Sequence, residues 1–290
     1  MNTSVRTLLC PGDPTLVDIQ TRNNLETAGH WNLYAEHRQR VDELLQARAP
    51  GDRLCILGAG NANSHDLQSL AARFAEVHLV DLDPIALDLA VERQAPAARD
   101  RIALHAPIDL SGILALLPAW RGLPPSIAEL ESLSRSVPDD IGRALPGPFD
   151  VVVSDCLFTQ ISWTCFKALG NGAVLRSVLL AALEAHLRTL VALTKPGGSC
   201  VFVTDAASGE DISPQDLLSE KGGLHLIQEL DRRGRLFSGT SLAVVLGVLR
   251  DELQESIESV EVVSPWLWQF LEGRSALVYA VTFHPHLASP

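Results

Sequence analysis

Two glycines and an aspartate carry the clearest chemical signal in this sequence. Gly58 and Gly60 follow directly on the apolar run 54–57, and Asp81 lies 21 residues beyond Gly60, at the end of a second apolar run. A glycine turn lets a ligand approach the backbone closely. An acidic residue about 20 positions later can accept hydrogen bonds from the hydroxyls of a ribose. The spacing therefore predicts a site for a cofactor that contains a nucleoside.

The elements that must position these residues are a strand, a helix and a second strand. The apolar run within 53–57 is typical of a strand buried on both faces of a parallel sheet. Leu67, Leu70 and Phe74 have helical spacing, which predicts a helix over 65–74, and residues 77–81 have the pattern of the second strand. Such a unit places the glycine turn and Asp81 at the same edge of the sheet.

The rest of the chain continues this alternation and predicts an α/β fold. We expect, in order, a helix over 84–94, strands at 102–104 and 149–155, a long helix over 172–193, a strand at 199–204, a helix over 241–258, a strand at 260–263 and a final strand over 276–283. Alternating strands and helices require a mostly parallel sheet with right-handed crossovers. The last two strands have no helix between them and predict an antiparallel hairpin. The expected fold is a doubly wound, seven-stranded, mostly parallel sheet with this C-terminal hairpin and an N-terminal helical cap.

Two segments lie outside the alternating pattern. Residues 1–50 are predicted to form the helical cap, with one helix over 30–47. Residues 111–148 contain six prolines and are interpreted as an insertion with short helices, one of them over 127–134. The expected organisation is a cap at 1–50 and one α/β domain at 51–290.

Composition and charge narrow the class of protein. A net charge of -12 without a basic run disfavours a nucleic-acid partner. No apolar stretch approaches the ~20 residues of a membrane span, and the N-terminus lacks the apolar core of a signal peptide. Five cysteines without CxxC spacing argue against a disulfide framework or a structural zinc site. We expect a cytoplasmic protein that binds neither membrane nor metal.

Five motifs, in this order, resemble those of class I (Rossmann-like) S-adenosylmethionine-dependent methyltransferases. They are ILGAGNAN at 56–63, VDLDP at 80–84, HAPIDL at 105–110, FDVVVSD at 149–155 and LTKPGGSCVFV at 193–203. The resemblance covers residues 50–205 and, more loosely, the closing hairpin. It implies that the cofactor is S-adenosyl-L-methionine and that the substrate accepts a methyl group.

Two other readings compete with a methyltransferase. An NAD(P)-dependent oxidoreductase has a third glycine three residues after the second, to allow close helix–strand packing, and Asn63 stands at that position here. A non-catalytic module that binds S-adenosylmethionine without transferring its methyl group would carry the same cofactor motifs.

The resemblance also implies how individual residues contact the cofactor. The glycine loop lies beneath the methionine portion, Asp81 accepts hydrogen bonds from the ribose, Leu82 packs on the adenine and Asp109 accepts from the adenine amino group. Asn61 and Asn63 either bind the amino-acid end or cap the following helix. The full set of cofactor-binding residues is Gly58, Ala59, Gly60, Asn61, Asn63, Asp81, Leu82, Ile108, Asp109, Asp155 and Cys156.

Asp155 and Cys156 stand at the tip of the fourth strand, where the resemblance places the methyl group opposite its acceptor. The sequence there is SDCLF and lacks the proline-rich, amide-recognising motif of amino methyltransferases that act on DNA bases or protein glutamine. Asp155 is either a catalytic contact or a structural cap. Gln160 and Trp163 are expected on the loop that follows, within reach of a substrate.

The helical cap carries the remaining candidates for catalysis. Tyr34 and His37 are three residues apart on the helix predicted over 30–47, and such a cap can close over the cofactor. His37 is a candidate general base, because histidine is the residue type most often used for general acid–base catalysis. The predicted acceptor is a small molecule, and the sequence specifies no oligomeric state.

Overall fold

The computed structural model of the 290-residue chain describes residues 13–46, 52–210, 212, 217 and 223–287. The first residues of the predicted cap, the segment 47–51 and Cys10 lie outside the described residues. The described cysteines, Cys55, Cys156, Cys165 and Cys200, are all buried and free.

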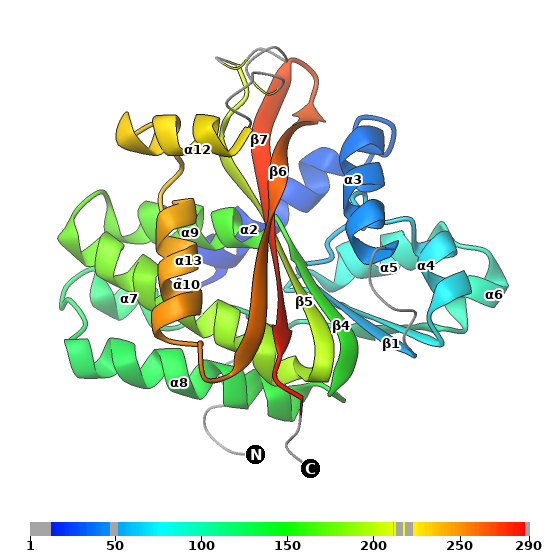
Figure 1. The fold of residues 1–290 in the computed structure, drawn as a ribbon, viewed down its shortest axis with the longest axis horizontal. Helices are drawn as coiled ribbons and strands as arrows, with labels where there is room; N and C mark the ends of the chain where they lie inside the picture. The colour runs from blue at the N-terminus through cyan, green and yellow to red at the C-terminus, as the bar shows by residue number, and fades with distance from the viewer. Residues whose placement is uncertain (1–12, 47–51, 211, 213–216, 218–222, 288–290) are drawn as a thin grey trace.

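One seven-stranded sheet forms the centre of the molecule (Figure 1). Its strands lie in the order β3-β2-β1-β4-β5-β7-β6. The first five are parallel, and β7 runs antiparallel to both β5 and β6. Their bounds are β1 (Arg53–Leu57), β2 (Glu76–Val80), β3 (Ile102–His105), β4 (Phe149–Asp155), β5 (Thr194–Ser208), β6 (Ile257–Leu271) and β7 (Arg274–Pro285). The predicted doubly wound sheet with a C-terminal hairpin is confirmed, and this strand order is that of the class I methyltransferase fold.

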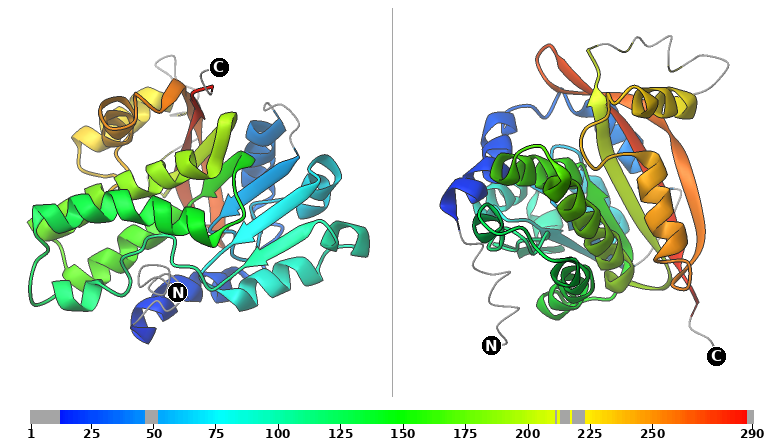
Figure 2. Two further views of the ribbon diagram at one scale, coloured as in Figure 1. Left: turned by 90° about the horizontal axis from the view of Figure 1, so that it is seen from below. Right: turned by 90° about the vertical axis from the view of Figure 1, so that its left-hand side faces the viewer.

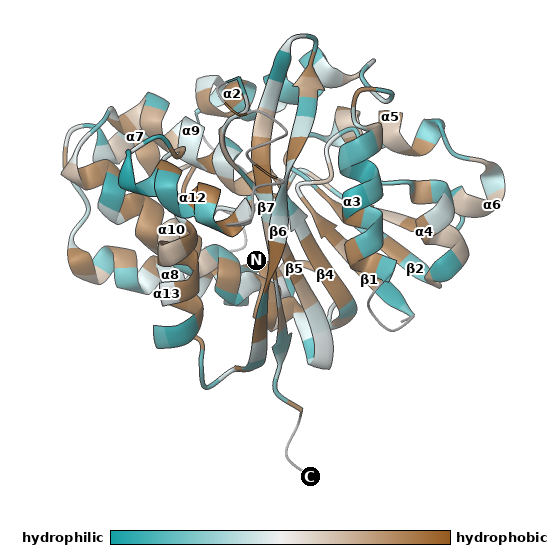
Figure 3. Ribbon diagram, turned by 45° about the horizontal axis from the view of Figure 1, so that its top comes forward, coloured by the Kyte–Doolittle hydropathy of each residue, from teal (hydrophilic) through white to brown (hydrophobic). Residues whose placement is uncertain are grey.

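Helices cover both faces of the sheet and make two cores (Figures 1 and 2). One core contains residues of α8 (Ile127–Ala144), α9 (Leu157–Leu169), α10 (Ala173–Leu193) and α13 (Leu242–Asp251), and the other contains residues of α3 (Ala35–Gln46), α4 (Leu67–Arg73) and α5 (Pro84–Glu92). Strand β1 serves both, because Cys55 and Leu57 face the first core while Leu54 and Ile56 face the second. Apolar residues accordingly gather along the strands (Figure 3), and no helix in the described part of the chain is long and apolar enough to cross a membrane.

The order in which the chain adds strands to the sheet reverses between β1 and β4. From β1 the chain builds β2 and β3 on one side, then returns to place β4 and β5 on the other. In open α/β sheets, ligands bind outside the carboxyl ends of the strands at such a reversal. The N-terminal helices meet here, because α2 (Pro14–Thr27) contributes to the first core and α3 to the second.

Several helices differ from the sequence-based expectation. The described part of the cap contains two helices, α2 and α3, separated by a turn at 28–34, where one helix over 30–47 was expected. Gln160 and Trp163 were expected on a loop and instead lie on α9, which begins immediately after β4. The remaining described helices are the short α6 (Pro96–Arg99) and α7 (Leu117–Trp120), and α12 (Gly223–Arg232).

The insertion at 111–148 contains a long helix in place of the short one expected over 127–134. Helix α8 has 18 residues and continues through Pro138, because its buried face, which includes Leu130, Val137 and Ile141, packs along α10. Strand β6 is likewise longer than predicted and joins 260–263 and 266–270 into one strand, whereas α13 is shorter than the expected 241–258.

Helix α8 starts with a capping box, and this allows a test of the insertion. Ser126 Oγ accepts from the Glu129 amide at 3.2 Å, and Glu129 Oε2 accepts from the Ser126 amide at 2.7 Å. Ser126→Ala should lower the free energy of unfolding by about 1 kcal/mol, measured by urea titration. Ser132→Ala, on the exposed middle of the same helix, should leave it unchanged or raise it slightly, since alanine favours helix. Equal losses for the two variants would contradict the role of the cap.

Candidate cofactor-binding site

The glycine loop after β1 has a backbone that only glycine adopts readily. Gly58 and Gly60 have φ of +72° and +48°. A Cβ atom at Gly58 would lie 2.8 Å from Leu157, and one at Gly60 would collide with the side-chain oxygen of Asn24 on α2. The loop is therefore enclosed by α9 on one side and by α2 on the other.

Asp81 ties the end of β2 to this loop. Its Oδ2 accepts from the Gly60 amide at 2.8 Å and its Oδ1 from the Asp83 amide at 2.9 Å. Burial raises the pKa of Asp81 to about 6, although the two amides oppose the shift. The carboxylate is thus poised to change charge near neutral pH, and each oxygen keeps a lone pair for a further donor.

A small cavity of about 20 Å³ brings together four of the predicted cofactor-binding residues, and Gln160, which was expected near the substrate, also lines it. Gly58, Asp81, Leu82 and Ile108 line it. Of these, Asp81, Leu82 and Ile108 were predicted to contact the ribose and adenine, and Gly58 the methionine portion. Its other lining residues are Gln20, Thr21, Leu110, Ser111, Leu157, Gln160 and Ile161.

Asp109 does not line this cavity. Its carboxylate accepts from the Ser111 amide at 2.9 Å, from Ser111 Oγ at 2.5 Å and from the Leu114 amide at 3.0 Å. Burial raises the pKa of Asp109, although these hydrogen bonds act in the opposite direction. In this arrangement Asp109 shapes the turn after β3 and so brings Leu110 and Ser111 to the cavity.

The two asparagines of the glycine loop bind the N-terminal helices. Asn61 Nδ2 donates to the Asn24 carbonyl at 2.6 Å, and Asn63 Nδ2 donates to the Thr27 carbonyl at 2.7 Å. Arg38 on α3 also donates to the Asn63 carbonyl at 2.7 Å. Both asparagine amides therefore fasten α2 to the glycine loop, and neither asparagine caps α4, whose N-cap is Asp66. Ala59, between the glycines, is buried in the core shared with α3.

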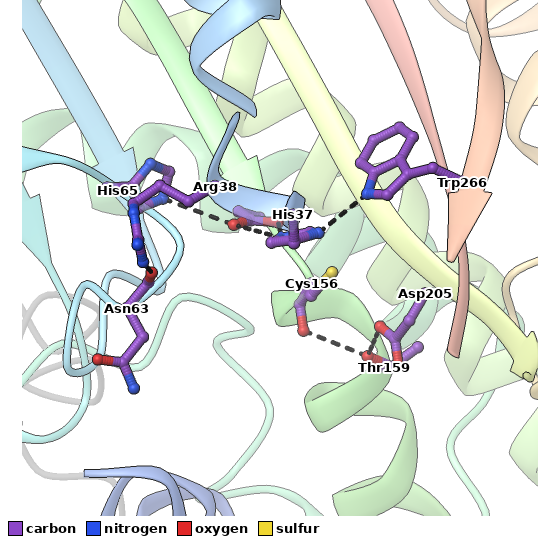
Figure 4. A network of polar contacts seen from close by, with 9 residues as sticks. His37, Arg38, Asn63, His65, Cys156, Thr159, Asp205 and Trp266 are labelled. Atoms are coloured by element: carbon purple, nitrogen blue, oxygen red, sulfur yellow. Dashed lines mark hydrogen bonds and ion pairs between the residues drawn. The ribbon is translucent and has the colours of Figure 1, made fainter. Parts of the chain in front are cut away.

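At the tip of β4, Asp155 lies beside two histidines, His37 and His65, which Figure 4 labels. His37 Nε2 lies 3.2 Å from both carboxylate oxygens, and His65 Nε2 lies 3.6 Å from Oδ2. Burial alone would raise the pKa of Asp155, but the facing histidines lower it to about 2. Burial also lowers the pKa of His65 to about 4, so this ring is neutral at pH 7. Asp155 is therefore a fixed negative charge.

The environment of His37 fixes its tautomer. Trp266 on β6 donates its indole N–H to His37 Nδ1 at 3.1 Å, so Nδ1 carries a lone pair and Nε2 carries the proton given to Asp155. The ring is fully buried and stacks on Trp268 at 4.6 Å between centroids. Tyr34 packs edge-on against Trp268. Burial raises the pKa of the Tyr34 hydroxyl despite a hydrogen bond with Thr27. Both nitrogens of His37 are thus engaged within the protein.

A second carboxylate lies beside this network, at the end of β5. Asp205 is half-buried and hydrogen-bonds with Thr159 on α9, and Thr159 Oγ1 also lies 3.2 Å from the Cys156 carbonyl (Figure 4). Burial raises the pKa of Asp205 to about 6. The sequence analysis missed Asp205, although its place after an apolar strand beside β4 is a signal of the same kind that identified Asp155.

Cys156 packs in the core and has a left-handed backbone. Its thiol lies within 4.8 Å of a ligand atom of His37 and of Asp155, a spacing compatible with a metal ion. The hydrogen bonds of His37 satisfy that histidine without one, and burial holds the pKa of the thiol well above its usual value. The contacts thus indicate a structural cysteine.

The Trp266–His37 hydrogen bond can be tested by a substitution at Trp266 that leaves the His37 imidazole intact. Trp266→Phe removes the indole N–H and leaves the buried Nδ1 of His37 without its donor, which should lower the free energy of unfolding by about 1–3 kcal/mol. Trp120→Phe is the matched control, because Trp120 is also buried, at 7% exposed, and its indole makes no hydrogen bond to another described residue. It loses the same packing without losing a hydrogen bond, and so should lower stability less in the same denaturant titration. Similar losses for both would contradict the assignment.

No protein-family model matches the chain, and no curated protein matches it. Similar solved structures include the methyltransferase domain of bacterial CtHen1, with 13% identity, 87% of this chain and 99% of that chain covered and a TM-score of 0.46. YcgJ from Bacillus subtilis has 9% identity, 88% and 100% coverage and a TM-score of 0.44. At such low similarity these structures assign no substrate or residue, and the fold follows from the strand order itself: the chain has the class I methyltransferase fold.

Proposed function

We propose that this protein is an S-adenosyl-L-methionine-dependent methyltransferase that acts on a small-molecule acceptor. One observation carries the proposal. Asp81, a buried carboxylate at the end of β2, lines one cavity with Gly58, Leu82 and Ile108, at the edge where the strand order reverses. These are the groups that a ribose diol and an adenine ring require, and they come from three separate segments of the chain.

The residues of the cavity have the chemical character that an adenosine site requires. Asp81 would accept hydrogen bonds from the ribose hydroxyls, while Leu82 and Ile108 would pack on the adenine faces. Asn61 and Asn63, by contrast, donate from Nδ2 to carbonyls of α2, so these groups could bind the amino-acid end of the cofactor only if α2 moved away. The cavity of about 20 Å³ is much smaller than typical ligand pockets of ~300–1,000 Å³, so its walls would have to open to admit the cofactor.

The topology argues against the oxidoreductase alternative. A dinucleotide fold commonly has six strands in the order 3-2-1-4-5-6, whereas here the antiparallel β7 is inserted between β5 and β6. A non-catalytic module that binds the same cofactor remains the competing hypothesis. Transfer of radiolabel from S-adenosylmethionine to a pool of small molecules would separate the two, because binding without turnover favours the module.

The cofactor supplies an activated methyl group on a sulfonium, and its sulfur leaves neutral. The protein therefore needs no acid, and its main contribution is alignment, which can lower a barrier by roughly 7–11 kcal/mol. An acceptor that must lose a proton also needs a base. Among the predicted catalytic residues, Asp155 is held ionised, while His37 and Tyr34 are buried and bonded within the protein. Half-buried Asp205, with a pKa of about 6, is better placed to accept a proton.

Calorimetric titration with S-adenosylhomocysteine tests the cofactor class. Asp81→Ala removes a charged hydrogen-bond acceptor, whose loss should cost about 1.5–3 kcal/mol and weaken binding roughly 10- to 150-fold. Asp88→Ala is the control, because Asp88 is an exposed carboxylate on α5 and should bind as the wild type does. Absence of binding to the folded wild-type protein would refute the proposal and favour nicotinamide cofactors.

The raised pKa of Asp81 makes binding depend on pH. Ribose hydroxyls donate to the ionised carboxylate, so binding favours loss of the Asp81 proton. Affinity for S-adenosylhomocysteine should be constant above about pH 7 and fall up to tenfold per unit below the pKa of about 6. Calorimetry in buffers of different ionisation enthalpy should detect proton release near pH 5 and little near pH 7.5. Asp81→Asn should abolish this release, and an unchanged release in that variant would assign it to another group.

A further inference from the structure

Helix α2 presents a polar stripe to the interior. Leu16, Gln20, Asn24 and Thr27 follow one another at helical spacing and lie on one face. Leu16 is buried in the core, and the side chain of Asn24 and the carbonyls of Asn24 and Thr27 bond with Asp83, Asn61 and Asn63. At one end of the stripe Leu16 contacts the core, and at the other end Asn24 and Thr27 contact the glycine loop. Gln20 lies between these two ends.

Gln20 is the exception in this stripe. Its side chain is only 8% exposed, and its Nε2 has no hydrogen-bond partner among the described residues. A buried amide without a partner is unfavourable by about 1–3 kcal/mol. Gln20 lines the same cavity as Asp81, Leu82 and Ile108, so its side chain borders the space assigned to adenosine.

We propose that Gln20 is a cofactor-binding residue that hydrogen-bonds the adenosine moiety, with α2 as the movable wall of the site. The inference rests on the proposed function and adds a residue that the glycine and acidic motifs do not contain. A carboxamide can turn to present either its N–H or its oxygen, so Gln20 can pair with a ring nitrogen, an amino group or a ribose hydroxyl.

The surroundings of α2 show where the helix has room to move. A groove of about 460 Å³ lies between α2 and α5 and shares Thr21 and Leu82 with the cavity. Asn24 crosses it to reach Asp83 Oδ2 at 3.3 Å, a long hydrogen bond. An outward shift of α2 would merge the groove with the cavity. When α2 closes around a bound nucleoside, Gln20 would gain the hydrogen-bond partner that it lacks without the ligand.

The test replaces Gln20 with methionine, which keeps the length of the side chain and removes its hydrogen bond. Asn23→Met is the matched control, because Asn23 is an exposed amide on the same helix. Binding is measured by calorimetry with S-adenosylhomocysteine and with 5′-methylthioadenosine, which lacks the amino-acid end. Thermal unfolding of each ligand-free protein is measured in parallel.

Gln20→Met should weaken both ligands by the same factor, roughly 3- to 10-fold. The ligand-free variant should unfold at the same or a higher temperature, because an unpaired buried amide has been removed. Gln20→Ala provides a second variant with the same loss of affinity. Unchanged affinity, or a parallel loss of affinity and ligand-free stability, would overturn the inference. A wild-type protein that binds neither ligand would instead refute the proposed function.

Discussion

The hydrogen bond from the Gly60 amide to Asp81 is the constraint on which the site depends. It joins the ends of β1 and β2 and requires the left-handed backbone of the loop, which in turn sets the positions of Asn61 and Asn63. Those asparagines hold α2, and α2 closes the cavity above Asp81. One buried carboxylate thus organises the loop, the N-terminal helices and the walls of the cavity.

Two buried aspartates at the same edge of the sheet have opposite properties because their neighbours differ. Asp81 has only backbone amides to offset its burial, and its pKa rises to about 6. Asp155 has His37 and His65, and its pKa falls to about 2. A ligand that donates hydrogen bonds can therefore change the charge of the first and not of the second. This separation suits Asp81 to binding and Asp155 to a permanent local field.

The sequence predicted the sheet better than the helices. Strands at 53–57 and 149–155 have the predicted bounds, because strands buried on both faces are continuous apolar runs. Helix α9 was missed because it starts directly after β4, without turn residues to mark it. Gly58, Asp81, Leu82 and Ile108 could be grouped from motif spacing. The partners of His37 and the position of Gln20 could not, because they join segments up to 229 residues apart through side-chain contacts.

The sequence analysis did not predict helix α2, and the reason is the same polar inner face that suggests a role for the helix in the proposed site. The inner face of a helix that only packs on a core is apolar, and such a face is readable from the sequence. The inner face of α2 changes from Leu16 to Gln20, Asn24 and Thr27, which removes the periodic signal. Polar groups on that face are stable only if each finds a partner, and the glycine loop supplies partners for Asn24 and Thr27. The same polarity that hides α2 in the sequence is what suits it to the proposed role as a wall of the cofactor site.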